Sequence, residues 1–467
     1  MVRMTRAPRT DPTAVEPNRT GLCPRVQGLA MKSHQPKKPR GDREGALLEE
    51  AAALLPASAR HATASAESAM IIREGRGPRV FDLSGNEYLD YLLGSGPMLV
   101  GHAHPMVLKS VTAALERGSS FLLPTEVTVE LAREIVRSTP CAERVVFGNT
   151  GSDGVIFAIR LARAYRRRDK VLKFEGAYHG QGDALLMSNQ WTTAPADFPH
   201  PVPNSIGLPE QVREEVLVAP WNDIDRTADL IAQYRDDLAC VIAEPMQRTL
   251  SPRPGFLEQL RELTHRADVP LIFDEVVTGY RLGYESGQGY YGVTPDLCVL
   301  GKSLSAGHPL SVVAGRFDLM KFAEGARRLT GDYVSLTGTY SGNPISCAAA
   351  LAALALFREP DVYPKLFERG RRLMQGCQQA FDSVGIPVQV TGEPPAFEPW
   401  FADHEIVDFR SAQKSNHALS SRFGQALLER GIMKAHEKFF VSIVHTDEDI
   451  EHTIDAIQDA AYELARA

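Results

Sequence analysis

The chain lacks the features that would place it in a membrane, on nucleic acid or in a disulfide-stabilised class. No apolar run reaches the ~18 residues that a transmembrane helix needs, so no span is predicted. The formal net charge of −7 offers no basic surface for nucleic acid. The six cysteines include no CxxC pair, so we expect neither a disulfide framework nor a metal site, and a reducing cytoplasm is the default location.

The nucleotide-binding signatures are missing as well. Neither the GxGxxG spacing of a dinucleotide site nor the GxxxxGK[ST] of a P-loop occurs in the chain. What is present is typical of a globular α/β protein: 43% hydrophobic residues, 23% charged residues and 37 glycines in 467 residues. That length predicts two to three domains at roughly 150 residues each.

The chain divides by composition and pattern into four parts. Residues 1–42 are basic and proline-rich and predict a disordered extension. Residues 43–100 form an N-terminal segment of a small domain, with a hairpin around Leu83–Asn86. In residues 101–345 short apolar strands alternate with helices, which favours a mostly parallel sheet covered on both faces. Residues 346–467 complete a smaller α+β domain.

The expected elements of the large domain follow from periodicity. Strands are predicted at 144–147, 171–174, 215–218, 240–243, 271–273 and 296–300. Long helices are predicted at 125–137, 155–167 and 255–267, and further helices at 347–357, 362–384, 413–430 and 447–465.

Lys302 directly follows the short strand predicted at 296–300. In a parallel sheet the carboxyl ends of the strands face the ligand crevice, so a lysine there is placed for chemistry. Taken alone, a surface lysine beside a turn is the simpler interpretation. The residues at the other strand ends favour the functional interpretation of Lys302.

A glycine-rich turn, Gly148-Asn-Thr-Gly-Ser-Asp-Gly154, follows the strand at 144–147 and precedes the helix expected from Val155. Backbone N–H groups at a helix N-terminus bind anions, and the hydroxyls of Thr150 and Ser152 flank Gly151 as further phosphate donors. An ordinary N-cap explains the same residues equally simply.

Further polar residues end the neighbouring strands. Asp274 follows the strand at 271–273, Glu244 follows the strand at 240–243, and Tyr178 with His179 comes soon after the strand at 171–174. A carboxylate at such a position can keep a pyridine nitrogen protonated, and a tyrosine can stack on a ring. An N-cap role for Asp274 and a half-buried structural role for Tyr178 remain open.

Together these residues supply what pyridoxal phosphate needs. The cofactor requires an amine for its aldehyde, an anion beside its ring nitrogen and donors for its phosphate. Lys302 provides the first as a Schiff-base lysine, Asp274 the second, and Thr150, Gly151 and Ser152 the third. The combination is far more specific than any single motif.

The motifs resemble those of the class III pyridoxal-phosphate aminotransferases, from about residue 45 to the end. The matching stretches are Gly148-Asn-Thr-Gly-Ser152, Phe174-Glu-Gly-Ala-Tyr-His-Gly180, Ala243-Glu-Pro245, Ile272-Phe-Asp-Glu-Val-Val-Thr-Gly-Tyr-Arg281, Gly301-Lys302 and Gly338-Thr-Tyr-Ser-Gly-Asn-Pro344. Asp82-Leu-Ser-Gly-Asn-Glu-Tyr-Leu-Asp90, Gly101-His-Ala-His-Pro105 and Phe440–Ile450 are most similar to the glutamate-1-semialdehyde aminomutase branch.

The resemblance implies a fold-type I transferase with a seven-stranded type of sheet, acting as a homodimer whose active sites use both chains. It implies that Tyr178 stacks on the cofactor ring and Val276 packs on the opposite face. Glu244 is implied near the substrate or the cofactor's hydroxyl side, His179 in the cofactor site, and Thr339 at the phosphate of the partner's cofactor.

The chain departs from the family pattern in two places that bear on substrate. The stretch after the lysine is Ser303-Leu-Ser-Ala-Gly-His-Pro309 instead of a glycine-rich loop, and the entrance motif is only partly present as Ser58-Ala-Arg60. Arg60 is the candidate clamp for a substrate carboxylate, because a guanidinium binds carboxylates bidentately; a surface arginine is the alternative.

The functional prediction is an aminotransferase that moves an amino group between a small-molecule donor and an oxo acceptor. In this prediction Lys302 moves the proton at the substrate carbon and Asp274 keeps the ring nitrogen protonated. The alternative is glutamate-1-semialdehyde 2,1-aminomutase, in which the amino group returns to the same molecule. A non-catalytic pyridoxal-phosphate-binding protein is a remote third.

Overall fold

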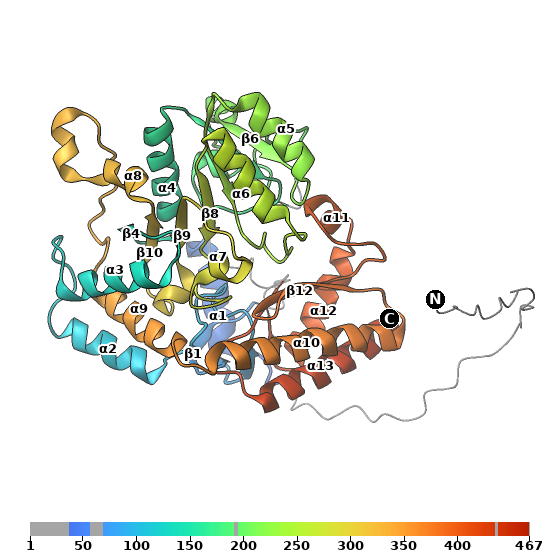
Figure 1. Ribbon diagram of the computed structural model, residues 1–467. Helices are drawn as coiled ribbons and strands as arrows, with labels where there is room; N and C mark the ends of the chain where they lie inside the picture. Colours follow the sequence, from blue (N-terminus) through green and yellow to red (C-terminus); the bar gives the residue numbers. More distant parts are fainter. Residues whose placement is uncertain (1–36, 57–68, 191–194, 435–437, 467) are drawn as a thin grey trace, which may run out of the picture. The chain divides into compact units, whose positions relative to one another are not determined.

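The computed structural model of the protein describes residues 37–56, 69–190, 195–434 and 438–466. Its largest sheet has seven strands in the order β4-β10-β9-β8-β7-β5-β6 (Figure 1). The strands are β4 (Arg144–Gly148), β5 (Lys170–Phe174), β6 (Val216–Ala219), β7 (Leu238–Ala243), β8 (Leu271–Glu275), β9 (Leu297–Leu300) and β10 (Ser311–Gly315).

Six of these strands run parallel, and β10 runs antiparallel to both of its neighbours, β4 and β9. The sequence predicts the six parallel strands to within three residues at each end but places no strand at Ser311–Gly315. The predicted α/β fold with a mostly parallel seven-stranded sheet is therefore confirmed, with β10 as the strand that the pattern misses.

Alternate residues of the strands face two separate cores, as expected for a sheet covered on both sides. In β7, Cys240 and Ile242 belong to the core formed with α4 (Gly151–Arg166), whereas Val241 and Ala243 face the other core. The second core receives residues from α5 (Ile224–Tyr234) and α6 (Phe256–Ala267). The sequence predicts α4 and α6, but α5 is not among its predictions.

Three further helices pack beside the sheet: α2 (Pro105–Leu115), α3 (Glu126–Ser138) and α9 (Pro344–Phe357). α9 begins where the side chain of Asn343 accepts the N–H of Ser346 at 2.9 Å, with Pro344 at its first position. It contacts α2, α3 and the short 3₁₀ turn η4 (Lys302–Ser305). The apolar helix α9 thus supports the turn that carries Lys302.

Strands from both ends of the chain meet in a second sheet, of order β1-β2-β3-β13. Its members are β1 (Ile72–Arg76), β2 (Arg79–Asp82), β3 (Glu87–Asp90) and β13 (Ile432–Met433); the hairpin β2–β3 confirms the turn predicted at Leu83–Asn86. A third sheet contains β11 (Gln389–Glu393), β12 (Ala396–Trp400) and β14 (Phe439–Phe440).

Two long helices, α10 (Val362–Val384) and α13 (Asp447–Arg466), lie side by side (Figure 1). Their exposed seam carries ion pairs, with Arg369 3.0 Å from Asp447 and Arg372 3.1 Å from Glu451. The helix expected over 413–430 is α12 (His417–Glu429), which begins later than expected because Asn416 caps it by accepting the N–H of Leu419. The short helix α11 (Phe409–Gln413) precedes it.

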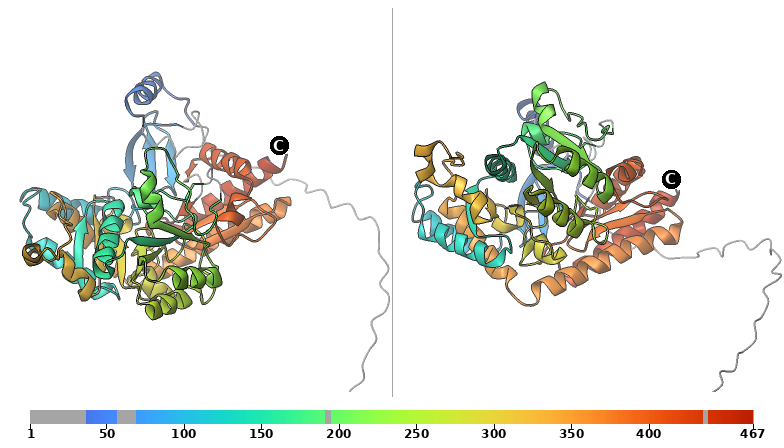
Figure 2. Two further views of the ribbon diagram at one scale, coloured as in Figure 1. Left: turned by 90° about the horizontal axis from the view of Figure 1, so that it is seen from above. Right: turned by 45° about the horizontal axis from the view of Figure 1, so that its top comes forward.

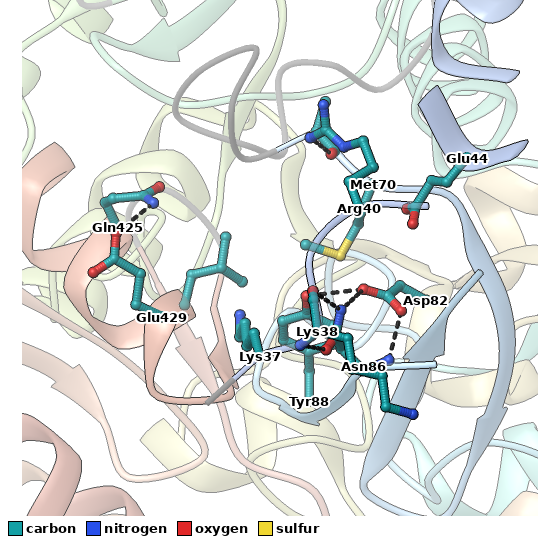
Figure 3. A pocket seen from close by; sticks show the side chains of 12 residues that line it. Lys37, Lys38, Arg40, Glu44, Met70, Asp82, Asn86, Tyr88, Gln425 and Glu429 are labelled. Carbon is teal, nitrogen blue, oxygen red and sulfur yellow. Dashed lines mark hydrogen bonds between the residues drawn. The ribbon is translucent and has the colours of Figure 1, made fainter. Parts of the chain in front are cut away.

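The helix α1 (Asp42–Leu54) lies next to the strands of the second sheet (Figure 2). Its buried Glu44 accepts the N–H of Ile71 at 2.8 Å and the hydroxyl of Ser84. Nearby, a hollow of about 170 Å³ is lined by Lys37, Lys38, Asp82, Tyr88, Glu429 and their neighbours (Figure 3).

The polar groups in this hollow largely satisfy one another. Asp82 accepts hydrogen bonds from Asn86 and Tyr88, and the ammonium of Lys37 lies 3.9 Å above the ring of Tyr88. Burial lowers the pKa of Lys37 to about 8, against the opposing charges of Asp82 and Glu429. We interpret the hollow as packing of the N-terminal segment on the sheet.

The described part of the chain contains neither a membrane-spanning helix nor a cluster of metal ligands. None of its helices combines the length and apolarity needed to cross a bilayer. Its histidines, cysteines and carboxylates form no cluster of three that would hold a metal ion.

Candidate active site

Lys302 occupies a strained backbone position just past the end of β9 (Leu297–Leu300). Gly301 separates it from the strand, and Lys302 itself begins the turn η4 with φ at 44°, in the left-handed region that side chains avoid. A second left-handed residue, Ala306 with φ at 49°, closes the turn. Such strain persists only where surrounding packing enforces it, and it concentrates at functional positions.

The amine of Lys302 is less basic than that of an ordinary lysine. Its pKa is lowered to about 8, chiefly by burial and also by the cations of Lys438 and Arg281, while the carboxylates of Asp274 and Glu244 act in the opposite direction. At neutral pH a larger fraction of the amine is therefore unprotonated, which is the form that attacks a carbonyl group.

Asp274 and His179 form a buried pair beside Lys302, at the end of the adjacent strand β8. The Nδ1 of His179 is 2.8 Å from the Oδ2 of Asp274, and the other carboxylate oxygen accepts the N–H of Val276 at 3.1 Å. Both side chains are at most 5% exposed. The far nitrogen of the imidazole, Nε2, is buried without a hydrogen-bond partner.

Glu244, at the end of β7, organises two loops. One of its oxygens accepts the N–H of Tyr178 at 2.8 Å, and the other accepts the N–H of Arg248 at 3.0 Å. The ring of Tyr178 is 38% exposed, and its hydroxyl accepts a hydrogen bond from Gln181 at 2.8 Å. The ring is thus accessible for stacking while its backbone is fixed.

The glycine-rich turn forms a helix N-terminus, four residues earlier than the sequence predicts. α4 begins at Gly151 instead of Val155, because Thr150 and Asp153 form a reciprocal capping box. The first-turn amides of a helix have no partner within the helix, so those of Gly151 and Ser152 can receive an anion. The hydroxyl of Ser152 also accepts the N–H of Gln181 at 3.1 Å.

Gly151 is required by close packing against Val276. A β-carbon built on Gly151 lies 2.9 Å from a methyl group of Val276, closer than real β-carbons approach other atoms. The residue predicted on one face of the cofactor and the predicted phosphate loop therefore meet directly. Lys302, Asp274 and His179 lie together at the same edge of the sheet, next to the loops that Glu244 fixes.

The remaining predicted residues lie elsewhere or outside the described chain. Thr339 is exposed in a surface hollow formed by residues 120–124 and 336–344. Ser58 and Arg60, the predicted substrate residues, lie outside the described residues.

Sequence reasoning missed Arg281 as a component of the site. Its side chain is 0% exposed, its Nε donates to the carbonyl of Val277 at 3.0 Å, and its Nη2 donates to the hydroxyl of Ser303 at 2.9 Å and to the carbonyl of Gly96. Its guanidinium lies 4.9 Å from the ring centre of Phe440, and burial lowers its pKa to about 9. Arg281 links segments far apart in the chain around the lysine turn.

The site fits a phosphorylated pyridine aldehyde. It offers a weakly basic amine at Lys302, a buried carboxylate at Asp274 and a helix N-terminus at Gly151 for a phosphate. Buried polar groups are normally paired, so the orphaned Nε2 of His179 also indicates a missing polar neighbour.

The model of the aminotransferase class-III family matches residues 61–461. The chain belongs to this family. The predictions of a class III enzyme, of pyridoxal phosphate as its cofactor and of the fold-type I architecture are thereby confirmed. Small-molecule amino and oxo substrates follow at the level of the family.

Relatives within the class III family include both predicted activities. The chain is 40% identical to a glutamate-1-semialdehyde 2,1-aminomutase of Desulforudis audaxviator, over 83% of this chain and 89% of that protein. An omega-transaminase from Sphaerobacter thermophilus superposes with a TM-score of 0.85 at 33% identity, covering 91% of this chain and 98% of that one. A glutamate-1-semialdehyde aminomutase from Pseudomonas aeruginosa PAO1 superposes with a TM-score of 0.80 at 26% identity, covering 90% of this chain and 94% of that one.

Proposed function

We propose that this class III enzyme moves the amino group within one molecule, as a glutamate-1-semialdehyde 2,1-aminomutase. The similarity to the aminomutases supports this alternative better than the intermolecular aminotransferase that the sequence pattern favours. The observation that carries amino-group chemistry itself is the placement of Lys302 and the buried His179–Asp274 pair at the ends of adjacent strands.

Pyridoxal phosphate, when bound, supplies an aldehyde that condenses with amines and a ring that withdraws electrons from the substrate carbon. Lys302 would hold the cofactor through its amine and would then move the proton at the substrate carbon. Asp274, fixed by His179, keeps the ring nitrogen protonated. The amides of Gly151 and Ser152 and the hydroxyl of Thr150 receive the phosphate.

The intermolecular aminotransferase is the second candidate, and the loop after Lys302 favours it. The hydroxyl of Ser305 donates to the carbonyl of His308, and Ala306 occupies a left-handed position that glycine usually fills. These features hold the loop in one conformation, unlike the glycine-rich loop expected of the aminomutase branch. The similarity to the omega-transaminase agrees with this candidate.

One experiment separates the candidates. Glutamate-1-semialdehyde is given to the purified enzyme without a second donor or acceptor, and the products are followed by NMR. The aminomutase predicts many turnovers to the isomer whose amino group has moved to the neighbouring carbon. At most one turnover per site, followed by sustained turnover once a 2-oxoacid is added, would establish the aminotransferase instead. A non-catalytic protein would show no spectral change with any amine.

We further propose a homodimer in which Thr339 acts in the partner's site. The exposed apolar side chains of Phe121, Leu122 and Leu123 support it, with Leu122 and Leu123 78% and 75% exposed. They line the hollow that contains Thr339. Apolar surface of this kind typically marks a protein interface, and a two-fold axis brings the same patch of two chains together.

The division into a large domain, residues 101–345, and a small domain from residues 43–100 and 346–467 remains our proposal. The pairing of β13 with β3 supports it, because strands from both ends share one sheet. The cytoplasm remains the proposed location. Cys141, Cys240, Cys298, Cys347 and Cys377 are buried free thiols, which agrees with a reducing compartment.

A further inference from the structure

Arg248 occupies a backbone position that suits glycine. Gln247 and Leu250 exchange two backbone hydrogen bonds of 3.1 and 2.8 Å, which makes Arg248 and Thr249 the central residues of a tight turn after β7. Arg248 has φ at 61°, whereas Thr249 does not have a positive φ. A positive φ at the first central position alone is the pattern of a type II′ turn, where glycine is the usual residue.

The side chain of Arg248 gains no ion pair in return for this strain. Among the residues that the structure describes, none forms a salt bridge or hydrogen bond with its guanidinium, and its buried Nε has no partner. Its central carbon lies 5.5 Å from the ring centre of Tyr178, a contact of modest strength. The terminal nitrogens also have no partner among the described residues, so the guanidinium can receive an anionic ligand.

The position of Arg248 places this donor at the candidate active site. Glu244 accepts the N–H of Arg248 and, through its other oxygen, the N–H of Tyr178. The turn of Arg248 and the loop of Tyr178 are thereby fixed to one carboxylate at the end of β7. Glu244 is engaged by these amides, which leaves the guanidinium beside the ring of Tyr178.

We propose that Arg248 binds the carboxylate of the substrate in this active site. The inference rests on the proposed amino-transfer function and names its substrate class: amines and oxo compounds that bear a carboxylate. A guanidinium pairs with a carboxylate through two parallel hydrogen bonds, and its two terminal nitrogens supply such a pair of donors. The α4 N-terminus is the separate anion site, for the phosphate.

This role explains both unusual features of Arg248. The left-handed backbone aims the side chain across Tyr178, and glycine at the same position would relieve the strain but remove the cation. The terminal nitrogens of the guanidinium, which no described residue engages, are the donors that the substrate would reach. Arg60, the clamp predicted from the sequence, is a different position in the chain, so the two arginines can be substituted one at a time.

The experiment uses holoenzyme and probes that differ only in a carboxylate. Pentanoate and pentanamide are titrated calorimetrically into the wild type and the Arg248→Met, Arg248→Lys and Arg248→Gly variants. Half-reactions with 5-aminopentanoate and pentylamine are followed by absorbance. Arg253→Met serves as the matched control, because the side chain of that arginine is 54% exposed and forms an ion pair with the exposed Glu405.

We expect Arg248→Met and Arg248→Gly to weaken pentanoate binding about tenfold or more, as expected for loss of a charge-assisted pair. The 5-aminopentanoate half-reaction should lose kcat/KM by a similar factor, chiefly through KM. Pentanamide and pentylamine should behave as in the wild type, and Arg248→Lys should lose less. An unchanged melting temperature for Arg248→Gly would show that the fold is intact.

Two results would overturn the proposal. Pentanoate bound equally well by the wild type and by Arg248→Met would show that Arg248 makes no carboxylate contact. Equal weakening of pentanoate and pentanamide would assign Arg248 to the support of Tyr178. If the wild type reacts with neither amine, the calorimetry still decides the role of Arg248, and turnover of glutamate-1-semialdehyde tests the amino-transfer function separately.

Discussion

The Nδ1 of His179 lies 2.8 Å from the Oδ2 of Asp274, and the two residues are separated by 95 positions in the chain. Both lie in the buried crevice at the carboxyl ends of the parallel strands. The imidazole thereby determines where the negative charge of Asp274 is held. This relationship makes His179 a positioning residue for Asp274, the carboxylate that we propose keeps the cofactor ring protonated.

Substitutions at His179 test this relationship. His179→Leu removes the hydrogen bond to Asp274 and should lower kcat by about tenfold to a hundredfold, as expected for loss of a bond to a buried charge. His179→Asn can still donate to Asp274 and should lose less. The two variants are compared by stopped-flow half-reactions with one amine, and equal activity of His179→Leu and wild type would contradict the role.

Asp274→Asn tests the charge itself. The amide keeps the shape and the contact with Val276 but removes the anion, so kcat should fall by about a hundredfold or more, since several kcal/mol of charge stabilisation are lost. The covalent link at Lys302 should still form, which the visible absorbance of the bound cofactor reports. Full turnover in this variant would show that Asp274 is only a turn residue.

The lowered basicity of Lys302 predicts a pH dependence. Below a pKa of about 8 the amine is a cation and cannot attack the cofactor aldehyde, and above it the amine is neutral. The rate at which pyridoxal phosphate attaches to the apo-protein should therefore rise with pH and level off above about 8. An ordinary lysine, with a pKa of ~10.4, would give a rate still rising there.

A substitution at Arg281 should shift the pH midpoint of the rate at which the cofactor attaches to Lys302. Arg281→Met removes a buried cation that lowers the pKa of Lys302, so the midpoint of the attachment rate should move to higher pH. Arg266→Met, which changes an exposed arginine on α6, is the control. A midpoint that stays in place in folded Arg281→Met would assign Arg281 to packing alone.

Gly151→Ala tests the contact between the phosphate turn and Val276. The added methyl group lies 2.9 Å from Val276 and must displace it, so we expect a loss of about 1–3 kcal/mol in stability or cofactor affinity. Gly424→Ala is the matched control, since its methyl group meets nothing within 4 Å in α12 and should stabilise the fold by ~0.5–1 kcal/mol. Thermal unfolding and cofactor titration measure both effects.

The proposed sharing of active sites between two chains predicts complementation between inactive variants. Lys302→Ala removes the reacting amine, and Thr339→Glu places a negative charge where the partner's cofactor phosphate is expected. Mixed dimers contain one site with both wild-type residues, so co-expression should restore about a quarter of the wild-type sites. Each variant alone should be inactive. No recovery in mixed dimers that are shown to form would place Thr339 outside the site.

Much of the fold could be predicted because its signals are local. Short apolar runs such as Leu297–Leu300 indicate buried strands, and the polar residues that follow them indicate the edge where a site lies. The predicted start of α4 at Val155 was wrong by four residues. Glycine and aspartate are typical of loops, and only the capping pair Thr150–Asp153 indicates that the helix begins at Gly151.

The remaining features of the fold and the site depend on contacts between distant parts of the chain, which no local sequence pattern contains. β10 is antiparallel, and its direction follows from its neighbours β4 and β9 rather than from Ser311–Gly315 itself. The bond between His179 and Asp274 joins the loop after β5 to the end of β8, which only the sheet order brings together. For Arg248, the exchange of backbone bonds between Gln247 and Leu250 defines the turn, and the charge beside Tyr178 follows from it.

The most direct test of the central claim is to locate the cofactor's covalent attachment. Holoenzyme is reduced with borohydride, digested and examined by mass spectrometry. Our account predicts a pyridoxyl-phosphate adduct on the peptide that contains Lys302 and no adduct in Lys302→Ala. A reduced adduct on another lysine, such as the buried Lys173, with Lys302 unmodified, would contradict it.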